Sequence, residues 1–494
     1  MSSEAGRPRP TDGQRAIDLI RFFVFTGLFF GIVYALLVPP FQVPDEVNHF
    51  KYAYHLSEGN FSGEARDDRL GGDLPVSLDS FAAIFRPLRF NYHEKSTADR
   101  RAVARDISLD PETKAFSDFP NVGAYAPTAY LPQAVFLYFG KMFDWRPLYL
   151  LYGSRLTGLF FWVTLVAFSL RLIPFKKELW LLCALLPSSV FINCGLTADL
   201  VTNAAAFLLT ALLLRLIFIE KAKLSPKIGV LIVLLSLLIA LNKFVYLPLT
   251  LLVFFIPKKK VTRRGLTLIV YFFLPVLVAF LFLRHNNGLF IHYDFYNPAF
   301  RDGQTINAGA DSGAQISYIL RHPFDFLRVM SRSWLTLAPA NTAHYLGKFG
   351  WEKNYLPAPF LLLSLLLLLW AIFRREKKYI SLPKMWKSTV LFIVLIISVL
   401  LSVTLYAVWN KVGADFMNGL QGRYFIPYFP LALMTAAAFF GSEKEDKPTE
   451  KNRFLRFLSL IRNPSARLYF SLIKVGIWLT LGAGVYAVVM RYFY

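Results

Sequence analysis

Cysteine and charge are both scarce in this chain of 494 residues. The two cysteines, Cys183 and Cys194, lie in one apolar segment, so no disulfide framework or metal cluster is implied. Charged residues make up only 17% of the chain and hydrophobic residues 55%, whereas a soluble protein carries about 25% charge. The sequence also has no Walker loop, Rossmann fingerprint, zinc spacing or nucleophile elbow. These absences exclude a disulfide-rich protein and a nucleotide-binding enzyme, and they favour a membrane protein.

The hydrophobic residues occur in blocks, and a bilayer core needs about 20 mostly apolar residues per helix. We therefore expect an all-α polytopic membrane protein with eleven spans, and twelve or thirteen spans stay open. The first block is too long for a signal peptide and lacks a small-residue cleavage site, so it is expected to be a retained anchor. The predicted spans lie near residues 17–39, 148–171, 178–195, 199–219, 227–241, 243–257, 265–284, 356–374, 386–409, 424–441 and 469–491.

Basic residues exceed acidic residues by 54 to 32, which gives a net charge of +22. With the N-terminus inside, the predicted inner segments carry about 18 of these charges, as the positive-inside rule requires. The excess charge therefore sets the orientation of the chain and predicts no nucleic-acid partner. We expect a multi-pass membrane protein with the N-terminus inside and the C-terminus outside.

Two outer segments, 40–147 and 285–355, are too long to be simple connections, and we expect short helices lying on the membrane within them. The hydrophobic stretch 124–143 belongs to the first segment. Counting it as a span would move basic loops outside, so we interpret it as a re-entrant or interfacial helix on the outer face. The domain organisation predicted is one transmembrane module over 1–440, followed by a basic cytoplasmic loop and a final transmembrane helix over 441–494.

An acidic cluster follows the first predicted span. Pro44 fits the first turn of a new helix, and Asp45 and Glu46 after it favour the positive N-terminus of that helix. Asp45, His49 and Tyr52 share one helical face by their spacing. Two carboxylates and a histidine are thus expected where the chain leaves the membrane on its outer side. Simple helix capping explains the acidic pair equally well.

Asp199 is a further carboxylate, in a short outer turn between two predicted spans. An ionisable residue at the bilayer boundary is costly and is therefore a functional candidate. The topology places Asp199 on the same side as Asp45 and Glu46. Such converging carboxylates could serve as base, orienter or metal ligands. A divalent cation, Mg or Mn, stays open as a cofactor of Asp45, Glu46 and Asp199.

Basic residues also occur on the outer side, where the charge rule disfavours them. Lys243 and Tyr246 lie at an outer turn, and Arg423 lies in the motif Gln421-Gly-Arg-Tyr424 before another span. Arginine suits bidentate recognition of phosphate, and the glycine lets the backbone approach closely. The alternative for both cations is snorkelling to lipid headgroups.

Polar and aromatic residues, among them Asn121 and Tyr125, open the stretch 124–143. Its aromatics fit an ordinary interfacial belt or a platform on which a sugar stacks. Arg155 lies one turn into the second predicted span, where we expect it to pair with a carboxylate.

Together these residues resemble a family of bacterial predicted membrane proteins without an assigned function, over roughly residues 20–440. That family is in turn similar to the GT-C superfamily of integral-membrane glycosyltransferases. The motifs that carry the resemblance are Pro-Pro-Phe-Gln-Val-Pro-Asp-Glu-x-x-His-Phe (39–50), Tyr125-x-Pro-x-x-Tyr-x-Pro-Gln133, Asp199 in Thr-Ala-Asp, Lys243-x-x-Tyr246 and Gln421-Gly-Arg-Tyr424.

The resemblance implies a GT-C-like bundle that moves a sugar from a polyprenyl-phosphate donor to a hydroxyl of a cell-envelope glycan, with inversion, on the outer face. Its partners would be that lipid-linked sugar, the glycan acceptor and the bilayer. The implied residues fall into a catalytic set (Asp45, Glu46, Asp199), a donor-phosphate set (Arg423, Lys243, Tyr246) and a substrate set (His49, Gln421, Tyr424, Asn121, Tyr125, Arg155).

The main alternative is a transporter or flippase of lipid-linked sugar or another anionic envelope precursor. Transporters place ionisable groups near the bilayer midplane, often within repeated halves. Here the candidate charges cluster at the outer boundary and no repeat is visible, which favours the enzyme. A non-catalytic scaffold for a cell-wall machine is a third interpretation.

Overall fold

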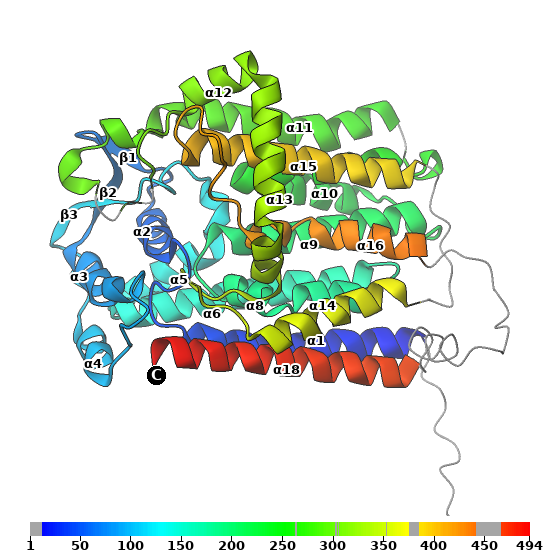
Figure 1. Ribbon diagram of the computed structural model, residues 1–494, viewed down its shortest axis with the longest axis horizontal. Coiled ribbons are helices and arrows are strands. Elements are labelled where there is room, and N and C mark those ends of the chain that lie inside the picture. The colour runs from blue at the N-terminus through cyan, green and yellow to red at the C-terminus, as the bar shows by residue number, and fades with distance from the viewer. Residues whose placement is uncertain are drawn as a thin grey trace, which may run out of the picture.

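The computed structural model describes residues 12–261, 264–301, 304, 306–351, 353–374, 385–440 and 466–494. Its long helices run side by side, and smaller elements gather at one end of them (Figure 1). Seven helical segments within this described part are long and apolar enough to cross a membrane. The chain is therefore a multi-pass integral membrane protein.

The long helices match the apolar blocks of the sequence closely. The predicted spans at 148–171 and 386–409, for example, appear as helices of nearly the same bounds. Two shorter apolar helices, α14 (Ala358–Phe373) and α16 (Phe429–Phe440), lie among the long ones. The long helices are α1 (Asp12–Leu37), α6 (Pro147–Leu172), α9 (Ala198–Phe218), α10 (Pro226–Lys243), α11 (Arg264–His285), α15 (Trp386–Trp409) and α18 (Ala466–Tyr492).

Two predicted spans are not regular α-helices. The stretch 178–195 is broken into α7 (Lys177–Ala184) and α8 (Pro187–Asn193), because the proline has no N–H to continue the first helix. Residues 244–255 form the 3₁₀ helix η3 (Phe244–Phe255), which contains Pro248.

The helix η3 runs back along the bundle beside α10. Lys243 pairs with Asp199 at the start of α9, whereas Lys260 Nζ donates to the carbonyl oxygens of Leu216 and Ile219 at the other end of α9. The chain therefore reverses direction at Lys243. This agrees with the prediction of two separate spans, 227–241 and 243–257.

The first outer segment contains the expected short helices and, in addition, a small sheet, so the expectation of an all-α fold is wrong. Strands β1 (Glu64–Arg66), β2 (Arg69–Pro75) and β3 (Lys114–Asp118) pair antiparallel in the order β1-β2-β3. Asp67 and Asp68 both have positive φ, the conformation of a two-residue hairpin turn. The strands are too short and too polar to give a clear alternating pattern.

Helices surround this sheet and form an outer module with its own hydrophobic core. Helix α5 has only 12 residues, about 18 Å, and is not among the candidate spans, which agrees with a re-entrant or interfacial position for the stretch 124–143. The helices of the module are α2 (Glu46–Ser57), α3 (Val76–Phe85), α4 (Ala98–Asp106) and α5 (Leu131–Met142).

The second outer segment contains short 3₁₀ turns, then α12 (Ser312–Arg321) and α13 (Pro323–Gly347). Helix α13 runs across the long helices instead of along them (Figure 1). It exposes Phe324 and Leu335 and buries Tyr345 and Gly347 near its end. This end of α13 approaches the site described below.

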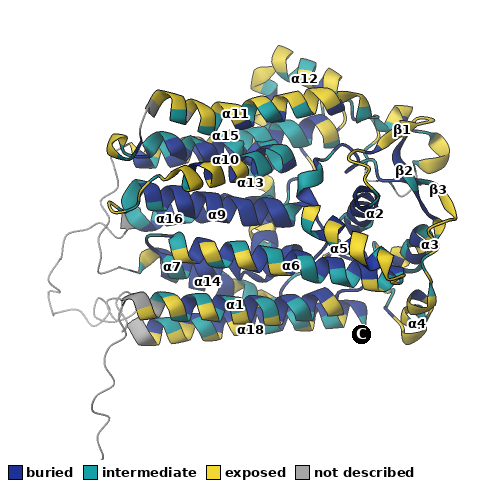
Figure 2. Cartoon of the chain, turned by 180° about the vertical axis from the view of Figure 1, so that it is seen from behind, coloured by how far each residue is buried: buried dark blue, intermediate teal, exposed yellow. Residues whose placement is uncertain are grey.

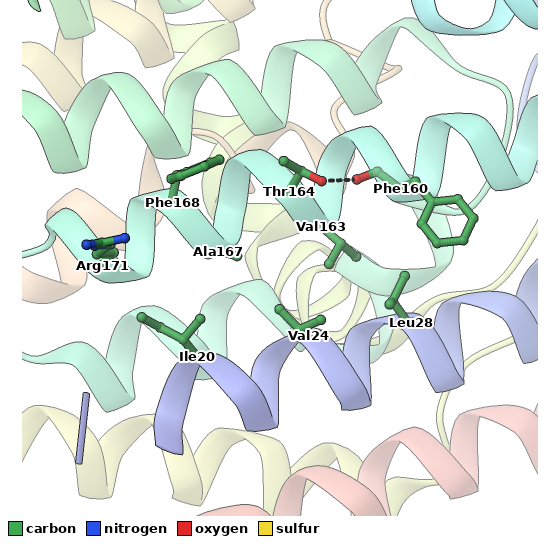
Figure 3. Close-up of a pocket in the computed structure, with 9 residues that line it drawn as sticks. All are labelled: Ile20, Val24, Leu28, Phe160, Val163, Thr164, Ala167, Phe168 and Arg171. Atoms are coloured by element: carbon green, nitrogen blue, oxygen red, sulfur yellow. Dashed lines mark hydrogen bonds between the residues drawn. The ribbon is translucent and has the colours of Figure 1, made fainter. Parts of the chain in front are cut away.

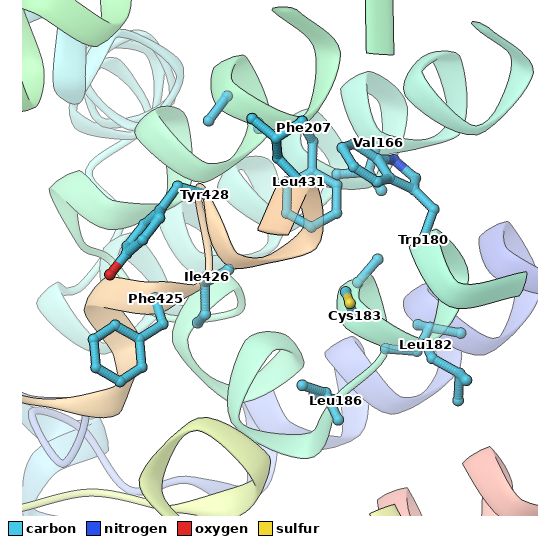
Figure 4. Close-up of a cluster of buried hydrophobic side chains, with 14 of the residues drawn as sticks. Val166, Trp180, Leu182, Cys183, Leu186, Phe207, Phe425, Ile426, Tyr428 and Leu431 are labelled. Carbon is cyan, nitrogen blue, oxygen red and sulfur yellow. The ribbon is translucent and has the colours of Figure 1, made fainter. Parts of the chain in front are cut away.

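Helix α9 lies at the centre of the bundle. In the most apolar stretch of α9, 89% of the residues are buried, compared with 12% in the span that contains α11. Figure 2 shows α9 mostly buried and α11 mostly exposed. Trp180 of α7 packs against Phe207 of α9, with ring centroids 4.9 Å apart, in the buried cluster of Figure 4. The first residues of α9 are thereby fixed relative to the rest of the bundle.

The last helix, α18, packs against α1 and α14 and ends under the outer module. Arg491 is 2% exposed, and its guanidinium group acts as a clamp that holds the module to the helix end. The backbone N–H of Ser96 donates to the carbonyl oxygen of Tyr492. Arg491 donates to the carbonyl oxygens of Leu88, Asn91, Tyr92 and Glu94.

Candidate functional site

Asp45 lies at the entry to α2 in a left-handed backbone conformation, with φ of 64°. The helix begins at Glu46, two residues after Pro44, where the sequence predicts its first turn. The side chain of Asp45 makes no capping hydrogen bond to α2. Simple capping therefore does not explain Asp45, whose carboxylate is 20% exposed and points to another part of the chain.

Glu46 points the opposite way and is completely buried. Its carboxylate forms two hydrogen bonds with Arg155, of 2.8 Å from Nε and 2.5 Å from Nη2. The backbone N–H groups of Phe41 and Leu196 donate to the same two oxygens, each at 3.0 Å. These four donors leave the carboxylate no free direction toward a substrate, so Glu46 is a structural residue.

Arg155 is equally enclosed, with 1% of its surface exposed. Besides Glu46, it donates to the carbonyl oxygens of Ala35, Val38 and Pro39 at the end of α1. The expected pairing of Arg155 with a carboxylate is confirmed. Its expected contact with substrate has no support in this geometry, since the guanidinium instead ties α6 to the end of α1 and the start of α2.

Four charged side chains meet where α2, α9, α10 and the 3₁₀ helix η8 (Gly422–Phe425) converge. Arg423 Nη2 lies 3.4 Å from Asp45 Oδ2, and Arg423 Nε lies 3.9 Å from Asp199 Oδ2. Lys243 Nζ donates to Asp199 Oδ1. We refer to Asp45, Asp199, Lys243 and Arg423 as the charge cluster.

The charge cluster is accessible but sheltered, since its side chains are between 8% and 20% exposed. It contains two carboxylates and two cations. Nε of Arg423 is buried and donates no hydrogen bond within the described residues. A donor inside a sheltered, charge-balanced site can bind an incoming anion.

Gly422 is the residue that allows Arg423 to reach the cluster. A Cβ atom at Gly422 would collide with the backbone carbonyl oxygen of Asn341 and the backbone nitrogen of Tyr345 in α13. The close approach expected from the glycine of this motif is thus confirmed. Tyr246 fixes η8 from the other side, because its hydroxyl donates to the carbonyl oxygen of Tyr424 at 3.0 Å.

Tyr246 therefore contacts the backbone of η8, which supports a positioning role more than direct phosphate binding. The ring centroid of Tyr424 lies 5.4 Å from both Lys243 Nζ and the guanidinium carbon of Arg423. Gln421 is half-buried at the start of η8.

His49 lies beside the charge cluster on α2. Burial lowers the pKa of His49 to about 4, although the charges of Asp45 and Asp199 oppose this shift. His49 Nδ1 forms a 2.6 Å hydrogen bond with the hydroxyl of Tyr130. The imidazole is thus neutral at pH 7 and held in one orientation.

Tyr125 and Asn121 are held next to α2 by hydrogen bonds. The hydroxyl of Tyr52 donates to the carbonyl oxygen of Tyr125 at 2.7 Å, and Asn48 Nδ2 donates to Asn121 Oδ1 at 2.6 Å. The spacing argument that placed Tyr52 with His49 is correct for the helix face. Tyr52, however, is buried and serves to position the segment around Tyr125.

Tyr130 belongs to the motif at residues 125–133 but is not one of the predicted site residues, and neither are Arg89 and Trp351. The guanidinium carbon of Arg89 lies 3.7 Å from the ring centroid of Trp351, whose Nε1 donates to the carbonyl oxygen of Phe41. Burial lowers the pKa of Arg89, and the charge of Asp45 opposes this. Arg89 and Trp351 thus lie beside the Asp45 loop. Only tertiary structure connects these distant segments, so no sequence signal could have linked Arg89 and Trp351 to Asp45.

A divalent metal does not fit the expected ligands. Glu46 is committed to Arg155, and Asp199 faces Lys243 and Arg423, so cationic side chains occupy the positions next to the carboxylates. Within the described residues, no group of three or more His, Cys, Asp or Glu side chains is arranged to hold a metal ion. The possibility left open by the sequence, that Asp45, Glu46 and Asp199 together bind a divalent cation, therefore has no support in this geometry.

A family model matches residues 28–432, and its description reads "Predicted membrane protein (DUF2142)". The expectation of a family of predicted membrane proteins is thus confirmed. No curated protein and no solved structure matches the chain.

Proposed function

Since the chain belongs to the DUF2142 family of predicted membrane proteins, in which the match covers α2, α9, α10 and η8, we propose that it is a glycosyltransferase of GT-C type. It moves a sugar from a polyprenyl-phosphate-linked donor to a hydroxyl of a cell-envelope glycan. The observation that carries this proposal is the charge cluster, in which Asp45 and Arg423 lie 3.4 Å apart.

Asp45 is the general base. It is the more exposed carboxylate of the cluster, and its side chain is engaged only by Arg423 among the described residues. The acceptor hydroxyl transfers its proton to the Asp45 carboxylate while the hydroxyl oxygen forms a bond to the anomeric carbon of the sugar. Attack from the face opposite the phosphate inverts that carbon.

Arg423 and Lys243 bind the donor phosphate. As the bond between the anomeric carbon and the phosphate oxygen breaks, both of its electrons remain on the leaving polyprenyl phosphate. Two fixed cations beside that oxygen stabilise the developing negative charge. Asp199 contacts both cations and so holds them in place. Nε of Arg423, which lies 3.9 Å from Asp199 Oδ2 and donates no hydrogen bond within the described residues, supplies one donor to the phosphate.

Tyr125, Tyr424 and the neutral His49 form the walls against which the sugar ring packs. The ring centroid of Tyr424 lies 5.4 Å from Lys243 Nζ and from the guanidinium carbon of Arg423, and Tyr125 is half-buried. Asn121, whose Oδ1 accepts from Asn48, lies four residues before Tyr125, and Gln421 directly precedes η8. Aromatic rings with amides nearby suit a sugar, which has apolar ring faces and hydroxyl edges.

The orientation of the bundle supports an outer-face reaction. Lys176 Nζ donates to the carbonyl oxygens of Ala371 and Ile372, and Lys260 to those of Leu216 and Ile219, all at the end of the bundle away from the charge cluster. Basic residues gather at cytoplasmic helix ends. The charge cluster is then at the outer boundary of the bacterial cytoplasmic membrane.

The test compares membranes from cells that make wild-type protein, the Asp45→Asn variant or no protein. Mass spectrometry quantifies polyprenyl-phosphate sugars and the sugars released from envelope glycan. We expect the lipid-linked sugar to accumulate, and one glycan sugar to be lost, in both the variant and the null cells. Unchanged glycan and lipid pools in the null cells would contradict the proposal.

The same membranes distinguish an enzyme from a flippase. A flippase defect would leave the lipid-linked sugar on the inner leaflet, protected from a membrane-impermeant glycosidase or periodate. A transferase defect leaves the sugar on the outer leaflet, where periodate oxidises it. Protection of the accumulated sugar would therefore favour the transport alternative.

A further inference from the structure

A groove between α1 and α6 lies away from the charge cluster, and the proposed function does not use it. Its volume is about 340 Å³. Figure 3 shows Ile20, Val24 and Leu28 of α1 along one wall, and Val163, Ala167 and Arg171 of α6 along the other. The members on α1 recur every four residues, so each helix contributes one continuous face.

Glycines bring α1 and α6 close together near the Leu28 end of the groove. A Cβ atom at Gly31 would lie 2.5 Å from Leu159 of α6, and one at Gly27 would lie 3.5 Å from Val163. Two glycines four residues apart allow helices to approach closely. Toward the start of α1 the glycines give way to Val24 and Ile20, which keep the helices apart.

The groove is apolar along its length. The hydroxyl of Thr164 already donates to the carbonyl oxygen of Phe160 at 2.8 Å, so it offers no free donor to an occupant. Phe160 and Phe168 are each more than half exposed at its edge. An occupant of this part of the groove must itself be apolar.

Positive charge marks the Ile20 end of the groove. Arg171 lies in the last turn of α6, and Arg21 follows Ile20 on α1; both side chains are exposed. Within the part of the chain that the structure describes, neither makes a hydrogen bond or ion pair. Lys176 and Lys177 nearby differ, because both donate to backbone carbonyl oxygens. An apolar channel that Arg171 lines at this end, with Arg21 next in the chain to the lining residue Ile20, complements an acyl chain attached to an anionic group.

We propose that this groove binds an anionic phospholipid of the inner leaflet, with one acyl chain between α1 and α6 and the phosphate group on Arg171 and Arg21. The length agrees with this occupant. From Phe160 to Arg171 the helix rises about 16 Å, which is half of a hydrocarbon core of about 30 Å. The proposal does not depend on the glycosyltransferase assignment.

The experiment uses native mass spectrometry of the detergent-purified full chain, titrated with phosphatidylglycerol or phosphatidylcholine of identical acyl chains. Wild-type protein should bind phosphatidylglycerol more tightly than phosphatidylcholine. Arg171→Gln should lower the phosphatidylglycerol affinity about fivefold, the effect expected for one basic residue at an anionic lipid surface. Ala167→Trp fills the groove. This variant should therefore bind one lipid molecule fewer than the wild type, whichever of the two lipids is added.

Lys227→Gln is the matched control, because Lys227 is an exposed basic residue at the same end of the bundle on α10. It should bind both lipids like the wild type. Equal affinity for the two lipids, or an Arg171→Gln variant with unchanged affinity, would overturn the proposal. Arg171 is exposed, so its variant tests the site even if Ala167→Trp fails to fold. If inorganic phosphate alone displaced phosphatidylglycerol from the wild-type protein, the site would bind a free anion. That result would also overturn the proposal.

Discussion

The carboxylate of Asp45 lies 3.4 Å from the guanidinium group of Arg423, although 378 residues separate them in the sequence. Asp45 is held by the positive φ at the entry to α2, and Arg423 by the close packing of η8 on α13. The pair therefore joins the first outer segment to the segment that precedes α16. The site exists only when both ends of the matched region are folded together.

Asp45→Asn is expected to reduce sugar transfer at least about 100-fold, because general-base catalysis contributes roughly 10²–10⁴ to a rate. Asp45 makes no capping bond, so the variant should keep the thermal midpoint of the wild type in detergent. Transfer in isolated membranes and a melting curve measure the two effects. Asp79→Asn is the control, since Asp79 pairs with Lys51 in the same outer module but away from the charge cluster. A fully active Asp45→Asn variant would disprove the base assignment.

Arg423→Gln is expected to weaken binding of undecaprenyl phosphate about 10- to 100-fold, since a hydrogen bond to a charged group contributes about 1.5–3 kcal/mol. Native mass spectrometry of the purified chain measures this affinity directly. Arg328→Gln, at an exposed arginine of α13, should bind like the wild type. Equal affinity in the two variants would remove Arg423 from the phosphate site.

Glu46→Gln is expected to destabilise the fold by about 3–5 kcal/mol, because it leaves the buried charge of Arg155 without its partner. Unfolding by a graded increase of SDS in mixed micelles measures the loss. Replacing both residues, Glu46→Gln with Arg155→Met, removes the orphan charge and should recover part of the stability. If Glu46→Gln were as stable as the wild type but inactive, Glu46 would be catalytic and its structural assignment wrong.

Gly422→Ala is expected to destabilise the protein by about 1–3 kcal/mol and to lower transfer, because the added methyl group must displace η8 and Arg423 from α13. Gly482→Ala in α18 is a matched control, since a Cβ there meets no atom within 4 Å. That substitution should leave stability unchanged or slightly raised. Melting curves and transfer assays on both variants separate the local collision from a general effect of alanine.

Stability should fall on acidification because of His49. Its pKa is about 4 in the folded protein and 6.5 in the unfolded chain, so between these values the unfolded state binds more protons. The contribution of neutral His49 is complete above pH 6.5 and is lost as the pH falls toward 4, with a total of the order of 3 kcal/mol.

His49→Gln removes this titration, so the variant does not lose the stability that the wild type loses through His49. The difference in thermal midpoint between wild type and variant should therefore narrow as the pH falls from 6.5 to 4. Burial also lowers the pKa values of His55 and His344, so the wild-type curve alone does not isolate His49. A difference that stays constant over this range would show that His49 is not buried in its neutral form.

The positions of the long helices were predictable because the membrane imposes a long apolar block on each. The break at Pro187 was harder to predict, because α7 and α8 are both apolar and only the proline marks their junction. The small sheet was missed because β1 has three residues, all exposed, and carries no alternation. Such strands form only when the surrounding outer module holds them.

The sequence made it possible to predict the candidate site as a set of charged residues on the outer side. It did not make it possible to predict where each side chain points. Asp45 and Glu46 are adjacent carboxylates, and nothing in the sequence separates them. The left-handed φ of Asp45 turns one toward Arg423 and the other toward Arg155. The partners Tyr130 and Arg89 depend on contacts between segments far apart in the chain, which local pattern does not encode.

The clamp of Arg491 on the outer module couples biogenesis to the order of membrane insertion. The carbonyl groups that Arg491 binds, from Leu88 to Glu94, leave the ribosome hundreds of residues before α18. Until α18 enters the bilayer beside α1, those carbonyl groups lack their arginine donor. A nascent chain therefore carries an incompletely secured outer module through most of its translation, and insertion of α18 is the step that secures it.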